Sequence, residues 1–225
     1  IHFIRQTDSL SFVQKFANNG FDFFHPQLFN LDNPESRAAC EFPVIYYLTA
    51  FLYKFFGSDY LYLKLINLII LYSGVFYLFR TIHLILKERI LSILLALIPF
   101  SSTIFNYYSF NYLPDSAALG FSFIGYYFMF LFIQSNTRRD LLKSAILFTL
   151  AGLLKPVFFI HPLVFFALAI FVLITPKITF FSRKQSIKVL RYLLMGIAVI
   201  VIWNIYVLYY NELNNTTYFN TRAMP

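Results

Sequence analysis

Long apolar runs separated by short charged clusters dominate the chain. Four runs of 20 or more residues have no charged side chain, namely 90–114, 116–137, 156–176 and 192–211. At about 1.5 Å per residue, each run could cross a hydrocarbon core of ~30 Å as a helix. A fifth run, 61–86, carries Lys64 and Arg80 near its ends, where long side chains can reach the membrane surface.

Two shorter apolar runs accompany these five. Residues 43–56 contain Lys54 and predict an interfacial helix, and residues 141–155 predict a short span or one half of a helix broken at Pro156. We therefore expect a bundle over 43–210, with an external polar segment before it (1–42) and the start of another after it (211–225). The spans are expected near 61–86, 90–112, 116–137, 157–176 and 190–210.

Composition supports a membrane protein. Hydrophobic residues make up 59% of the chain and charged residues only 12%, against about 25% charged in an ordinary soluble domain. These values exclude a disordered chain and argue against a soluble globule. The predicted fold is an all-α polytopic membrane protein. Because the chain begins with Ile1 in a polar stretch, we expect it to be a fragment of a longer protein.

The net charge of +8 is distributed unevenly. Three clusters, at 80–89, 138–143 and 177–191, contain 11 basic and 2 acidic residues, whereas the rest of the chain contains 7 basic and 8 acidic residues. The clusters are separated by pairs of spans, so the positive-inside rule places them in the cytoplasm. We expect a bacterial inner-membrane protein whose residues 1–64, Asp115 and Lys155 face the periplasm. This distribution also excludes a continuous nucleic-acid-binding face.

The polar segment before the first span predicts one short helix. Thr7, Asp8 and Ser9 are typical helix-start residues, and Phe12 and Phe16 follow at helical spacing. A loop rich in Asn, Asp and Pro then leads to the next apolar run. We therefore expect an amphipathic helix and a loop on the outer surface.

Four short motifs carry a family resemblance. They are RQTD at 5–8 with NG at 19–20, EFPVIYYLTAFLYKFFG at 41–57, LPD at 113–115 and LKP at 154–156. In this order they resemble the bacterial membrane glycosyltransferases of the GT-C superfamily. Relatives in that superfamily include the protein O-mannosyltransferases and the lipid A aminoarabinose transferases.

The resemblance implies transfer of a sugar from a polyprenyl phosphate to a lipid, glycan or protein acceptor. In the family, the first external loop carries an acid that is essential for transfer, and Asp8 matches that position. Many relatives have a second acid next to it, where this chain has Ser9. A divalent metal is compatible with such a site, although the sequence identifies no ligand set for one. From local sequence alone, Asp8 could instead cap a helix.

Other polar residues expected on the outer side are candidates for substrate binding. A leaving polyprenyl phosphate requires cations, and Arg5 and Lys155 are suitable. Asp115, Glu41 and His25 could contact substrate. Each of these residues has an alternative role. Arg5 could pair with the nearby acid Asp8, and Lys155 could anchor its helix at the membrane surface. Asp115 could cap a helix, Glu41 could have a structural role, and His25 could simply lie at the membrane boundary.

A polytopic protein without enzymatic activity, such as a lipid-linked-glycan flippase or a transporter, remains the alternative. Transporters often contain helices broken by Gly or Pro at mid-membrane and repeated halves. The chain has only 7 Gly, few charges within its spans and no internal repeat, so we favour the enzyme.

Overall fold

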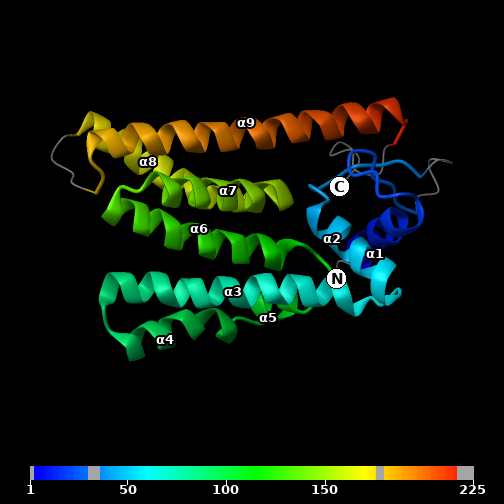
Figure 1. Ribbon diagram of the computed structural model, residues 1–225, viewed down its shortest axis with the longest axis horizontal. Helices are drawn as coiled ribbons and strands as arrows, with labels where there is room; N and C mark the ends of the chain where they lie inside the picture. The colour runs from blue at the N-terminus through cyan, green and yellow to red at the C-terminus, as the bar shows by residue number, and fades with distance from the viewer. Residues whose placement is uncertain (1–2, 30–35, 176–179, 217–225) are drawn as a thin grey trace.

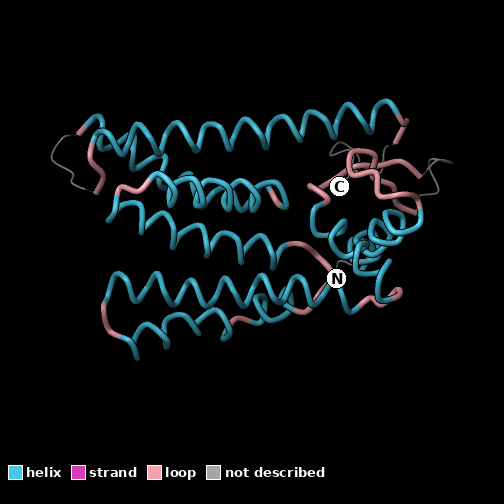
Figure 2. The backbone as a smooth tube through the Cα atoms, viewed as in Figure 1, coloured by secondary structure: helices cyan, strands magenta, loops and turns pink. Residues whose placement is uncertain are grey.

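The computed structural model describes residues 3–29, 36–175 and 180–216 (Figure 1). Helices joined by short loops make up this part of the chain, and its only β-type pairing is an isolated bridge between Gln27 and Arg37 (Figure 2). The predicted all-α polytopic membrane fold is confirmed. The helices in chain order are α1 (Phe3–Asn18), α2 (Val44–Phe56), α3 (Leu61–Leu86), α4 (Arg89–Leu97), η1 (Ile98–Ser101), α5 (Thr103–Ser109), α6 (Asp115–Ser135), α7 (Arg138–Leu154), η2 (Pro156–Phe159), α8 (Ile160–Ile174) and α9 (Arg183–Leu213).

Within the described residues, four helical segments are long and apolar enough to span a membrane: α3, α6, η2 with α8, and α9. The run at 90–112, expected as one span, is broken instead. Its parts, α4 with η1 and then α5, are bent by 80°. Pro99 lies in η1, and the Ser102 hydroxyl accepts a hydrogen bond from the Phe105 N–H to start a new helix. A proline followed by a capping serine therefore ends one helix and begins another.

Small residues allow α6 to pack closely against α3. A Cβ atom on Gly74 would lie 2.5 Å from the Cα of Gly120, and one on Gly120 would lie 2.5 Å from the carbonyl oxygen of Ile70. Such contacts bring two backbones together, which is a common way for membrane helices to associate. On its other side, α6 packs against α7, and α9 then packs against both α7 and α8.

The two ends of the bundle differ in character. The α3–α4 connection, the α6–α7 connection and the start of α9 lie together at the left end in Figure 1, whereas α1 and α2 lie at the right end. The left end therefore carries the basic clusters of the sequence, apart from Lys177, which lies outside the described residues. Three basic clusters that are separated along the chain by pairs of apolar runs thus lie at one end of the molecule.

The first helix is longer than the sequence pattern indicated. It already includes Phe3, so Asp8 lies inside α1, and its predicted alternative role as a helix cap is wrong. The hydroxyls of Thr7 and Ser9 donate to the carbonyls of Ile4 and Arg5 at 2.6 and 3.0 Å, as hydroxyls do inside helices.

Aromatic stacking holds α1 against α2. The rings of Phe12 and Tyr46 are stacked with centroids 5.4 Å apart, and Phe16 meets Tyr47 edge to face at 5.6 Å. The buried core at this end also includes residues from α3, α6 and α7. Packing therefore fixes the position of α1 relative to the bundle.

Candidate functional site

The loop before α2 is fastened to the bundle by backbone and amide contacts. The Asn211 side chain accepts from the N–H of Ala39 at 2.8 Å and donates to its carbonyl at 2.9 Å. Farther along the loop, the N–H of Phe42 donates to the carbonyl of Leu153 at 3.1 Å. Both ends of the segment 39–42 are therefore held, one by α9 and the other by α7.

Between these attachments, Glu41 forms an ion pair with Lys155. The Nζ of Lys155 lies 2.5 Å from Oε1 of Glu41, and the two side chains are only 14% and 18% exposed. The second carboxylate oxygen accepts from the thiol of Cys40 at 2.7 Å. The indole N–H of Trp203 in α9 donates to the carbonyl of Cys40 at 3.2 Å and steadies this part of the loop.

The surroundings of the pair keep both groups ionised. Burial would raise the pKa of the Glu41 carboxyl, but the ammonium of Lys155 and the hydrogen bonds from Cys40 and Lys155 leave that pKa below its ordinary value. Burial would likewise lower the pKa of Lys155, but the negative charges of Glu41 and Asp115 raise it overall. The pair therefore contributes a fixed positive and a fixed negative charge at neutral pH.

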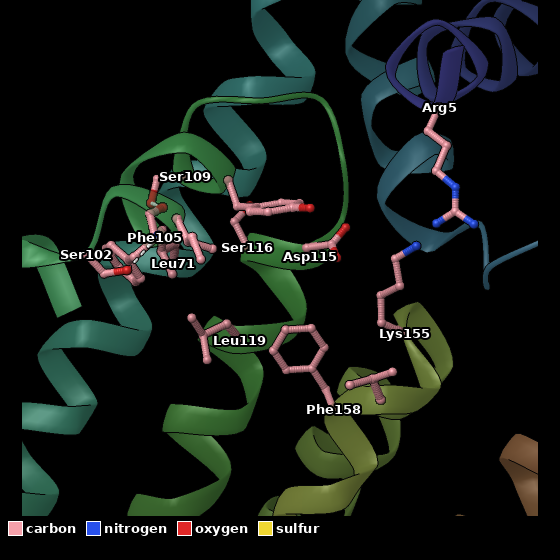
Figure 3. Close-up of a pocket in the computed structure, with 13 residues that line it drawn as sticks. Arg5, Leu71, Ser102, Phe105, Ser109, Asp115, Ser116, Leu119, Lys155 and Phe158 are labelled. Atoms are coloured by element: carbon pink, nitrogen blue, oxygen red, sulfur yellow. Dashed lines mark hydrogen bonds between the residues drawn. The ribbon is translucent and has the colours of Figure 1, made fainter. Parts of the chain in front are cut away.

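Two cavities meet at this pair. The larger, about 550 Å³, is lined by Arg5, Asp115 and Lys155 and by apolar side chains of several helices (Figure 3). The other, about 420 Å³, is lined by Asp8, Arg5 and Glu41, together with residues of α9. Arg5 belongs to both, and the ion pair joins a wall of one cavity to a wall of the other.

Polar atoms without partners line the larger cavity. Asp115 is the first residue of α6, and its Oδ2 atom is buried without a hydrogen bond to any described residue. The hydroxyl oxygen of the adjacent Ser116 is also buried without a hydrogen bond to any described residue. Because buried polar atoms normally have partners, the two groups are suited to a polar ligand. No side chain caps the start of α6, whose cap residue is Pro114.

Two cations point into the same space. Figure 3 shows Arg5 reaching down from α1 and Lys155 reaching up from the connection after α7, with Asp115 on the facing wall. Two cations that converge repel each other, and anions nearby offset that repulsion. Glu41 and Asp115 supply two such anions, and the space between the cations is suited to a further one, such as a phosphate.

The structure does not bring His25 to this site. Its Nδ1 lies 2.7 Å from the carboxylate of Asp22, and both side chains are more than half exposed. The pair lines a separate cavity of about 280 Å³, together with Lys15 and Arg37. Of the sequence candidates, Asp8, Arg5, Glu41, Lys155 and Asp115 therefore come together, and His25 lies apart.

The donors present do not form a metal site in the described part of the chain, where no three His, Cys, Asp or Glu side chains gather. Glu41 is engaged by Lys155 and Cys40. Ser9, next to Asp8, is not an acid, and its hydroxyl hydrogen-bonds to the hydroxyl of Tyr46 at 3.2 Å. The residues at this site therefore do not fit a bound divalent ion.

Sequence reasoning missed several residues of the larger cavity. Ser102, Ser109 and Phe105 come from the broken helix, and Phe158 comes from η2. A signal was present in the run PFSST at 99–103, where a proline precedes a capping serine within an apolar stretch. An uncharged run otherwise resembles one continuous span, because the absence of charge alone does not mark a break within it.

Apolar helices form a bundle, and at one of its ends paired charges lie beside a cavity with mostly apolar walls. These features define a membrane protein with a charged site at one end of its helical bundle. The chain belongs to the dolichyl-phosphate-mannose-protein mannosyltransferase family, whose model matches residues 33–206. The match covers well over half of the 225 residues and confirms the predicted resemblance to GT-C enzymes. The protein is therefore a membrane glycosyltransferase of the mannosyltransferase type.

Searches of curated proteins and of solved structures find no match. The region matched to the family includes Glu41, Asp115 and Lys155 but begins after α1. The interpretation of Asp8 and Arg5 therefore depends on the cavity geometry and on the motif at residues 5–8.

Proposed function

We propose that the chain forms the core of an enzyme that transfers a mannose-type sugar from a polyprenyl phosphate to a hydroxyl acceptor on the outer face of the membrane. One observation carries the proposal: Asp8, Arg5 and Lys155, from two separate parts of the chain, line adjoining cavities that share Arg5. The family assignment supports a sugar-transfer reaction.

The larger cavity would hold the donor. Leu71, Leu119 and Phe158 supply apolar walls that suit the first part of an isoprenoid chain. The phosphate would lie against Arg5 and Lys155, where charge-assisted hydrogen bonds stabilise the anion that leaves. The unpartnered oxygen of Asp115 would accept a hydrogen bond from a sugar hydroxyl.

The second cavity would hold the acceptor, with Asp8 as general base. As the acceptor oxygen bonds to the anomeric carbon, the bond from that carbon to the phosphate oxygen breaks and Asp8 takes the hydroxyl proton. Glu41 would act as a positioning residue that holds Lys155 toward the donor phosphate. His25, in its separate cavity, would contact only a remote part of an extended acceptor.

The proposed orientation is that of a multi-pass bacterial inner-membrane protein with its active site facing the periplasm. Support comes from the basic connections at one end of the bundle and the site residues at the other. Polyprenyl-phosphate sugars displayed on the outer leaflet would then reach the larger cavity directly from the lipid.

The test is transfer by the full-length protein in proteoliposomes supplied with polyprenyl-phosphate [³H]mannose and an envelope extract as acceptor. We expect label to leave the lipid and appear in a new glycosidic linkage. If the intact donor only moves between leaflets and no linkage forms, the protein is a flippase or transporter and the proposal is wrong.

A further inference from the structure

The starts of α7 and α9 lie at the end of the bundle away from the candidate site (Figure 1), and cations from the two helices gather there on the seam between them. The Nε of Arg138 donates to the hydroxyl of Tyr192 at 2.7 Å, and Lys188 donates to the side-chain oxygen of Asn136 at 3.2 Å. Arg191 follows Lys188 by three residues, so it lies near Lys188 on the surface of α9, and it is exposed. The hydrogen bonds bring cations of the two helices together across the seam.

Little negative charge opposes these cations. The nearest acidic residue in sequence is Asp140, in the first turn of α7, whose carboxylate accepts from Ser135 at 3.3 Å. Among the described residues, neither Arg138 nor Lys188 nor Arg191 forms an ion pair, and the hydrogen-bond partners of Arg138 and Lys188 are neutral oxygens. The start of α7 also has no side-chain cap, so its free N–H groups add positive potential.

Exposed apolar residues continue from the cations along both helices. On α7, Leu142 and Ile146 follow Arg138 at intervals of four residues, and on α9, Met195 and Val199 follow Arg191 at the same interval. Residues four apart share one face of a helix. Each helix therefore presents a cation at the bundle end and then an apolar stripe toward the middle of the membrane.

We propose that this seam binds a phospholipid with a net negative headgroup, such as phosphatidylglycerol. The headgroup phosphate accepts hydrogen bonds from Arg138, Arg191 and Lys188, and the acyl chains lie along the apolar stripes of α7 and α9. A zwitterionic lipid fits less well, because its ammonium group brings positive charge to a surface that is already positive. This site is independent of the sugar-transfer reaction.

The test is native mass spectrometry of the full-length protein in detergent with equal amounts of dioleoyl phosphatidylglycerol and dioleoyl phosphatidylcholine. We expect preferential retention of phosphatidylglycerol by the wild type. We expect the preference to fall about tenfold in Arg138→Gln/Arg191→Gln. The matched control is Lys87→Gln/Arg89→Gln, which removes two charges from the α3–α4 connection at the same bundle end and is expected to keep the preference.

Replacement of Arg138 and Arg191 by Lys separates binding from a structural role, because it keeps the charge and is expected to keep the preference. Thermal unfolding of each variant shows whether the fold is intact. The proposal is overturned if the wild type retains both lipids equally. It is also overturned if the two double-Gln variants lose the preference to the same extent, since the effect would then be one of overall charge.

Discussion

At the scale of single residues, the site is organised by the pair between Glu41 and Lys155. The sequence indicated that both were polar residues on one side of the membrane, but it could not indicate that they meet. They are 114 positions apart, and their contact depends on the attachment of the loop to α7 and α9. The residue types at the site were therefore predictable, whereas their pairing required the tertiary structure.

Removing one member of this pair should destabilise the protein. Lys155→Met leaves the carboxylate of Glu41 buried without its counter-charge, and we expect a loss of about 3 kcal/mol in unfolding free energy. The double variant Glu41→Gln/Lys155→Met should recover most of that loss. Denaturant unfolding of the detergent-solubilised protein measures both, and an additive loss in the double variant would contradict the ion pair.

The pair also gives stability a defined dependence on pH. The pKa of Glu41 is lowered in the folded state, so its contribution is present above its ordinary value of 4.5 and is lost as pH falls through the lowered pKa. The pKa of Lys155 is raised, so its contribution is present below 10.5 and is lost as pH rises through the raised pKa. The melting temperature of the wild type should therefore be highest between these two pH values and fall below and above them, whereas the double variant, which lacks both groups, should not show these two losses.

Cys40 should react slowly with maleimide at neutral pH. Burial and the adjacent negative charge of Glu41 raise the pKa of its thiol, and only the thiolate is nucleophilic. Glu41→Gln removes that charge and should speed alkylation, as measured by peptide mass spectrometry over time. Labelling of wild type as fast as that of the unfolded chain would contradict this description of the thiol.

At the scale of elements, the long apolar helices were predictable from the length of their uncharged runs. The break between η1 and α5 was not, because charge counting gives no weight to a proline and a serine within an apolar run. The break has a structural consequence: it brings Ser102 and Ser109 into the wall of the larger cavity.

The close crossing of α3 and α6 can be tested by adding one methyl group. Gly120→Ala places a Cβ 2.5 Å from a backbone oxygen of α3, which cannot move without shifting the helix. We expect a loss of about 1–3 kcal/mol in unfolding free energy. Gly196→Ala is the comparison, because its new Cβ meets a side-chain hydroxyl, that of Thr149, and no backbone atom; relief there costs the hydrogen bond from that hydroxyl to the Ala145 carbonyl, so we expect the smaller loss. Equal losses of unfolding free energy in the two variants would show that the backbone contact does not set how closely α6 packs against α3.

At the scale of the whole molecule, the charge pattern was the most informative feature of the sequence. It predicted that three basic clusters share one side, and the bundle brings their described residues to one end. The alternation could be read without tertiary structure, because each pair of spans returns the chain to the side it left. The arrangement of the cavities at the other end could not, since it depends on how α1 lies across the bundle.

The proposed orientation predicts which positions can be labelled from outside the cell. In a Cys40→Ser background, Ser58→Cys lies between α2 and α3 and Thr137→Cys lies between α6 and α7, both at exposed positions. A membrane-impermeant maleimide should label Ser58→Cys on intact cells and label Thr137→Cys only after permeabilisation. The reverse pattern would place the candidate site in the cytoplasm.

The most direct test of the central claim is the rate of single-turnover transfer from pre-bound donor by the full-length protein. Asp8→Asn should slow this step by about 10²–10⁴-fold while donor affinity is retained, because a general base acts on the acceptor. The matched control Asp22→Asn removes an exposed carboxylate in the separate cavity and should keep the wild-type rate. Transfer by Asp8→Asn as fast as by Asp22→Asn would contradict the assignment of Asp8 as the base.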